Sequence, residues 1–127
     1  MKEIIQTNKS PKAIGPYSQA IKVSGSQMLF LSGNISLDPN TMELVGETAG
    51  EQCRQVMENI SQVLKAGGAD FSKVVKTTIY LADMNNFAEI NEVYAGYFSE
   101  APPARVTVEV SRLPKDVKVE IDAIAVL

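Results

Sequence analysis

The chain has 127 residues, 45% of them hydrophobic, which suits a single domain spanning residues 1–127 around one sizeable core. Its net charge of −3 and the lack of any stretch rich in lysine or arginine make nucleic acid an unexpected partner. The longest apolar runs are far shorter than a membrane span and the N-terminus has no signal-peptide core, so we expect a cytoplasmic protein with no membrane partner.

The N-terminal third of the chain predicts three short strands. Residues 3–7 form the first, and a loop with proline and glycine follows from Ser10 to Ser18. Two apolar runs, Ala20–Val23 and Met28–Leu31, flank Ser24-Gly25-Ser26. This arrangement predicts a β-hairpin in which the two runs pair with each other.

The middle of the chain alternates between helix and strand. A helix is predicted from about Thr48 to Ala66, because Gly67-Gly68 is a typical signal for a helix C-terminus. Val74–Leu81 is rich in β-branched residues and predicts a strand. A second helix, ending before Pro102-Pro103, is indicated by apolar residues at helical spacing, namely Phe87, Ile90, Tyr94, Tyr97 and Phe98.

The only cysteine, Cys53, belongs to the apolar stripe of the first predicted helix. The stripe consists of Cys53, Val56, Met57, Ile60, Val63 and Leu64. A cysteine at this spacing is expected to be an inert core residue rather than a nucleophile. A single cysteine cannot form an intrachain disulfide, so a reducing compartment is the simpler expectation.

Two further strands, Ala104–Ser111 and Val117–Val126, complete the predicted elements. Together they indicate an α+β fold with one mixed β-sheet and two helices. If both helices are packed on one face of the sheet, the other face must be covered by neighbouring subunits. We therefore expect an oligomer.

The last two strands alternate in a way that predicts a second hairpin, with residues 112–115 as its loop and Ser111 opposite Asp116. In this register Glu109 lies opposite Lys118, Thr107 opposite Glu120 and Arg105 opposite Asp122. Arg105 and Glu120 would then share one face of the sheet and could serve one site, as a carboxylate-binding guanidinium and a water-activating carboxylate. A solvated ladder of cross-strand ion pairs fits the same pattern.

The absence of histidine limits the chemistry that the chain can perform. It removes the Ser-His and Cys-His nucleophile pairs and the usual imidazole ligands of zinc. Carboxylates, lysines, tyrosines and bound water remain for proton transfer, and arginine remains to hold anions. Tyr17, which follows Gly15-Pro16, and the pair Ser32-Gly33 are further candidates for a functional site. Each also suits a structural role, because the Tyr17 ring can pack in the core and Ser32-Gly33 can end a strand.

Three segments carry a resemblance to a known family: GPYSQA at residues 15–20, LSGNI at 31–35 and PARVTVEVSRLPKDVKVEIDAIA at 103–125. They closely resemble the reactive-intermediate (imine) deaminase family, also called YjgF. The resemblance implies a chorismate-mutase-like fold and a homotrimer whose sheets line its centre. It also implies three active sites in clefts between neighbouring subunits, with no cofactor and no metal.

The resemblance assigns roles to six residues of this chain. Arg105 is similar to the family's carboxylate-binding arginine and Glu120 to its water-activating residue. Tyr17 corresponds to a tyrosine that closes the pocket, and Ser32, Gly33 and Thr107 to residues that line it. Thr107 stands where many members have cysteine, and Asn34 where glutamine is common.

The activity implied by the resemblance is hydrolysis of reactive 2-imino and enamino acids, such as 2-iminobutanoate and 2-iminopropanoate, to 2-keto acids and ammonia. Such a substrate already hydrolyses unaided in water, so orientation and modest acid-base help are enough. Two alternatives stay open. One is a non-catalytic ligand-binding trimer that affects translation or transcription, and the other is an endoribonuclease.

Overall fold

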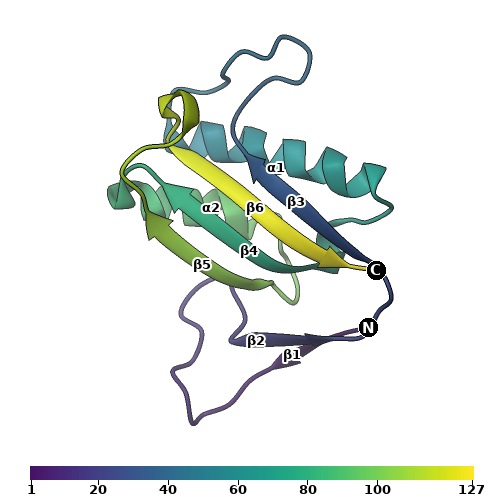
Figure 1. Ribbon diagram of the computed structural model, residues 1–127. Coiled ribbons are helices and arrows are strands. Elements are labelled where there is room, and N and C mark those ends of the chain that lie inside the picture. The colour runs from purple at the N-terminus through teal and green to yellow at the C-terminus, as the bar shows by residue number, and fades with distance from the viewer.

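The computed structural model describes residues 1–127 and contains a four-stranded mixed sheet covered by two helices (Figure 1). Its strand order is β3-β6-β4-β5, in which β4 and β5 are parallel and the other neighbours are antiparallel. The bounds are β3 Met28–Asn34, β4 Val74–Leu81, β5 Ala104–Glu109 and β6 Val119–Val126. The α+β class and the mixed sheet are thereby confirmed.

Helices α1 (Ala49–Ala66) and α2 (Phe87–Ala95) lie on the same face of this sheet (Figure 1). Helix α1 begins with a capping box, in which the Thr48 hydroxyl accepts from the Glu51 backbone N–H at 3.1 Å and the Glu51 carboxylate accepts from the Thr48 N–H at 3.1 Å. Gly67 ends it, as predicted. Neither helix combines the length and apolar character that a membrane span needs. Three short 3₁₀ turns complete the helical residues: Phe71–Lys73, Met84–Asn86 and Pro114–Asp116.

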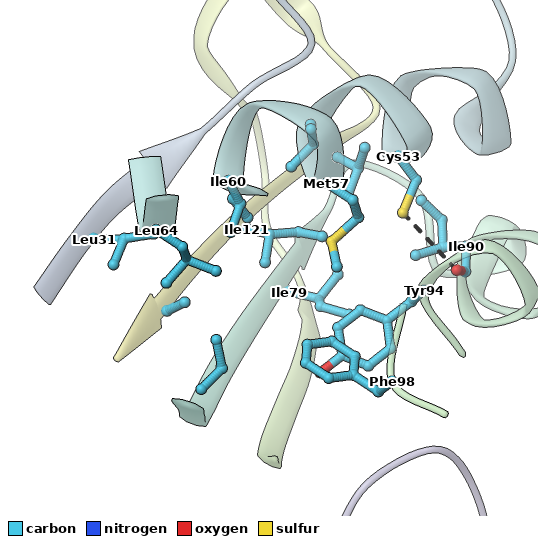
Figure 2. Close-up of a cluster of buried hydrophobic side chains, with 14 of the residues drawn as sticks. Leu31, Cys53, Met57, Ile60, Leu64, Ile79, Ile90, Tyr94, Phe98 and Ile121 are labelled. Atoms are coloured by element: carbon cyan, nitrogen blue, oxygen red, sulfur yellow. Dashed lines mark hydrogen bonds between the residues drawn. The ribbon is translucent and has the colours of Figure 1, made fainter. Parts of the chain in front are cut away.

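The core lies between the helices and the sheet (Figure 2). Met57 and Ile60 of α1 meet Ile79 and Ile121 of the sheet, and the core extends to Tyr94 of α2. The Tyr94 hydroxyl is satisfied by the Thr77 hydroxyl at 2.8 Å, so a polar group is buried at little cost.

Cys53 is fully buried, as predicted, and burial raises the pKa of its thiol to about 12. Its sulfur points to the Ile90 carbonyl oxygen at 3.9 Å (Figure 2). One member of the predicted stripe, Val63, is instead 47% exposed, because it lies at the edge of the buried arc of α1. The Cys53 thiol is therefore structural. The predicted stripe was wrong only in including Val63 among the buried residues.

The predicted hairpin between Ala20–Val23 and Met28–Leu31 was wrong. In the structure β2 (Ala20–Val23) pairs with β1 (Lys2–Ile5) in a separate two-stranded sheet, and β3 pairs with β6. Gly25 does not form a tight turn but packs against the Leu127 carbonyl, where a β-carbon would clash. Local turn chemistry was therefore overridden by pairing with distant segments.

The predicted C-terminal hairpin was also wrong, because β4 lies between β5 and β6 (Figure 1). Helix α2 forms the crossover between parallel strands β4 and β5, and residues 110–118 then pass the end of β4 to reach β6. The predicted cross-strand ion pairs are consequently absent. The one ion pair in the structure joins Arg112 to Asp116 at 2.8 Å within this connection.

The face of the sheet that carries no helix is open and partly apolar. Phe30 and Met28 of β3 are 71% and 54% exposed, and Val106 and Val108 of β5 are also exposed. Large apolar side chains grouped on one sheet face are typical of a surface that a partner covers.

Candidate active site

Arg105 is the centre of the first half of the candidate site. It pairs in register with Thr77 of β4, whose side chain is buried against α2, so Arg105 points to the helix-covered side of the sheet. Its guanidinium Nη1 donates to the Asn91 side-chain oxygen at 2.6 Å. Burial lowers the pKa of Arg105, and the neighbouring Tyr94 and Tyr17 oppose that effect.

Three aromatic rings surround the guanidinium. Its central carbon lies 5.1 Å from the ring centre of Tyr94, 5.5 Å from that of Tyr17 and 5.7 Å from that of Phe87. These rings stabilise the cation but carry no net negative charge that could neutralise it. No carboxylate of the chain forms an ion pair with Arg105. A half-buried guanidinium without an anionic partner is suited to bind an anion from outside.

A cavity of about 270 Å³ opens beside the guanidinium. It is lined by Ile14, Gly15, Tyr17, Phe87, Asn91, Arg105 and Thr107. The Thr107 hydroxyl is buried and has no hydrogen-bond partner. The backbone N–H of Ile14 donates to the Tyr17 hydroxyl at 3.4 Å, which ties the loop before β2 to the mouth of the cavity.

Glu120 is the centre of the second half of the candidate site. It pairs with Tyr80 of β4, and β3 bulges beside it between Leu31 and Asn34. Gly33 lies in this bulge, and its missing β-carbon leaves the space that the Glu120 carboxylate occupies. Burial raises the pKa of the Glu120 carboxyl, and the charge of Asp122 raises it further.

Arg105 and Glu120 lie on opposite faces of the sheet, contrary to the predicted arrangement. Their register partners, Thr77 and Tyr80, are three residues apart on β4, and side chains three apart on a strand point to opposite sides. The structure therefore divides the predicted site residues into two groups. Tyr17, Arg105 and Thr107 line the cavity, whereas Ser32, Gly33 and Glu120 belong to a corner of the open face.

Four residues that line the cavity were not predicted as site residues: Ile14 and Gly15 of the loop before β2, and Asn91 and Phe87 of α2. Asn91 holds the guanidinium, and Phe87 forms one wall next to it. Both lie on α2 four residues apart and thus on one helix face. A polar asparagine within an apolar helical stripe was the available signal. No group of three or more histidine, cysteine, aspartate or glutamate side chains is arranged to hold a metal ion.

Known proteins match this chain over nearly its full length. The model of the family described as Endoribonuclease L-PSP matches residues 7–127. A RutC family protein of Pyrococcus horikoshii is 58% identical over 125 residues, covering 98% of each chain. A Mus musculus protein named 2-iminobutanoate/2-iminopropanoate deaminase is 46% identical over 126 residues, covering 99% of this chain and 92% of the mouse protein.

A solved structure agrees with these matches. The crystal structure of E. coli TdcF with bound serine has a TM-score of 0.75 and 41% identity, and the match covers 98% of each chain. The chain therefore belongs to the family described as Endoribonuclease L-PSP, which is the reactive-intermediate deaminase (YjgF) family that its sequence motifs resemble.

Proposed function

We propose that this protein hydrolyses 2-imino acids, with 2-iminobutanoate and 2-iminopropanoate as representative substrates, to 2-keto acids and ammonia. The observation that carries the proposal is the half-buried Arg105 guanidinium, which faces a cavity and has no anionic partner. A planar guanidinium binds a carboxylate through two parallel hydrogen bonds. The mouse relative named as a deaminase and the serine bound to TdcF both fit a site for small molecules with an α-carboxylate.

The separation of Arg105 from Glu120 leads us to place the complete site between two copies of the chain. The Arg105 cavity of one copy would face the Glu120 corner of the next. In a closed homotrimer this contact repeats three times, and the open sheet faces are covered. The exposed apolar side chains of that face, including Phe30 and Val106, support such an assembly.

The reaction needs only orientation and the transfer of two protons from water to the departing nitrogen. Arg105 holds the substrate carboxylate while Tyr17 and Phe87 confine the rest of the molecule. Glu120 accepts a proton from water as its oxygen bonds to the imine carbon, and the C=N electron pair moves to nitrogen. Glu120 then returns the proton to nitrogen, which gives a carbinolamine with one hydroxyl and one amino group. Glu120 next takes the hydroxyl proton and passes it to the amino nitrogen as the C–N bond breaks, so that ammonia leaves and the keto group forms.

The test is the rate of ammonia and keto-acid release from 2-iminobutanoate that a dehydratase generates in the assay. We expect wild type to accelerate release, and Arg105→Ala and Glu120→Ala each to lose about 10³-fold in kcat/KM. Arg112→Ala is the matched control, because Arg112 is exposed and remote from the cavity. The assembly mass of every variant is checked by sedimentation.

Absence of acceleration by wild type would contradict the proposal. Carboxylate binding without turnover would then favour the ligand-binding alternative. Cleavage of RNA that both variants lose would instead favour the endoribonuclease alternative.

A further inference from the structure

Three polar side chains form a cluster on the open face of the sheet: Tyr80, Glu120 and Asp122. Glu120 and Asp122 are two residues apart on β6 and so point to the same side, and Tyr80 of β4 is the register partner of Glu120. The Tyr80 hydroxyl reaches diagonally across the strands and donates to the Asp122 carboxylate at 3.1 Å. This hydrogen bond raises the pKa of Tyr80, so its hydroxyl keeps its proton and remains the donor.

No cation neutralises the two carboxylates. Lys118 precedes Glu120 by two residues and Lys76 lies further along β4, but neither forms an ion pair with Glu120 or Asp122. The other side chains on this face near Glu120 carry no charge: Ser32 of β3, Thr78 of β4, and Val106 and Val108 of β5. In the proposed cleft the neighbour's Arg105 is bound to the substrate carboxylate. Asp122 is therefore the fixed charge next to Glu120.

We propose that Asp122, oriented by Tyr80, is a positioning residue for Glu120, because its negative charge makes the neighbouring carboxylate a better proton acceptor. This inference rests on the proposed function. Gly33 lies on the other side of the Glu120 carboxylate. Because Gly33 has no β-carbon, the carboxylate can lie against the backbone of the β3 bulge. Gly33 thus determines where the Glu120 carboxylate lies, and the charge of Asp122 determines how strong a base it is.

The physical basis is the repulsion of like charges. A second carboxylate about 6 Å away disfavours the ionised form by roughly half a pH unit even at the dielectric constant of water. After burial, Asp122 is the second cause that raises the pKa of Glu120. A stronger base removes a proton from water more readily, as long as it stays ionised at the working pH.

The experiment has two readouts on the full-length protein. The first is the titration midpoint of the Glu120 carboxyl, followed by NMR on protein with labelled glutamate side chains and assigned with Glu120→Gln. The second is the acidic limb of the pH profile of kcat/KM for 2-iminobutanoate hydrolysis. Both are measured for wild type, Asp122→Asn, Asp122→Glu and Tyr80→Phe, with the fold and assembly mass checked in each.

We expect Asp122→Asn to lower the Glu120 midpoint and the acidic limb together by about half a pH unit. Asp122→Glu keeps the charge and should restore both. Tyr80→Phe keeps both carboxylates and should give a smaller shift in the same direction, which preserves the test if Asp122→Asn does not fold.

Two results would overturn the inference alone. One is a Glu120 midpoint that stays unchanged in Asp122→Asn, and the other is a midpoint that moves while the acidic limb of an active enzyme does not. A wild type without turnover would remove the proposed function, and this inference with it. The NMR midpoint would still report separately whether the two carboxylates interact.

Discussion

The two faces of the four-stranded sheet are built for different purposes. The helix-covered face packs Ile79 and Ile121 into a closed core and encloses the Arg105 guanidinium between aromatic rings. The open face instead exposes Phe30 and places the Glu120 carboxylate against Gly33 in the β3 bulge. Under the proposed function, the Arg105 cavity of one copy binds the substrate and the Glu120 carboxylate of a neighbouring copy transfers protons. Within a single chain, the Arg105 guanidinium and the Glu120 carboxylate are kept apart by the sheet.

The largest effect expected is on stability, and it should appear on the covered face. Ile79→Ala leaves a cavity in the closed core and should lower the free energy of unfolding by about 3.5 kcal/mol. Val63→Ala is the control, since this side chain is half exposed on α1, and it should change the value by about 0.5 kcal/mol or less. Denaturant unfolding at one protein concentration measures both. Equal losses would refute the assignment of the core to this face.

Next in size is the effect of replacing the guanidinium by another cation. Arg105→Lys keeps the positive charge but cannot form two parallel hydrogen bonds to a carboxylate or reach Asn91 with the same geometry. We expect kcat/KM for 2-iminobutanoate to fall about 100-fold, whereas Arg112→Lys leaves it unchanged. Full activity in Arg105→Lys would show that charge alone suffices.

A smaller change tests the corner of the open face. Gly33→Ala introduces a β-carbon where the Glu120 carboxylate lies, and the flexible end of that side chain can move away. We expect about a tenfold loss of kcat, with an unfolding free energy within about 0.5 kcal/mol of wild type. Unchanged kcat in a folded assembly would mean that the exact place of the carboxylate does not matter.

The smallest effect is expected at Cys53. The pKa of about 12 and complete burial leave almost no accessible thiolate, so iodoacetamide should not modify the native protein at neutral pH. Mass spectrometry after treatment checks this, and unfolded protein serves as the reactive control. Rapid modification of the native protein would show that the covered face opens readily.

Local signals in the sequence predicted the elements well. The glycines after Ala66 marked the end of α1, and the β-branched run at Val74–Leu81 was found without error. Strand partners were predicted poorly, because alternation fixes which residues share a face of one strand but not which strand lies beside it. Both predicted hairpins failed for this reason.

The candidate site was affected by the same limit. The hairpin aligned Arg105 with Asp122, whereas β4 aligns it, through Thr77, with Ala123. A shift by one residue exchanges the two faces, so Glu120 moved to the side opposite Arg105. The expected roles of these residues came from motif resemblance, but their placement on opposite faces of the sheet could not be seen without the strand order.

Under the proposed function, Arg105 of one copy and Glu120 of another serve one cleft. The most direct test of this shared cleft is to unfold and refold Arg105→Ala and Glu120→Ala together and to measure 2-iminobutanoate hydrolysis. In randomly mixed trimers about a quarter of the clefts regain both residues, so we expect about a quarter of wild-type activity from two variants that are inactive alone. If the mixed trimers form and stay inactive, the claim of a site shared between copies is contradicted.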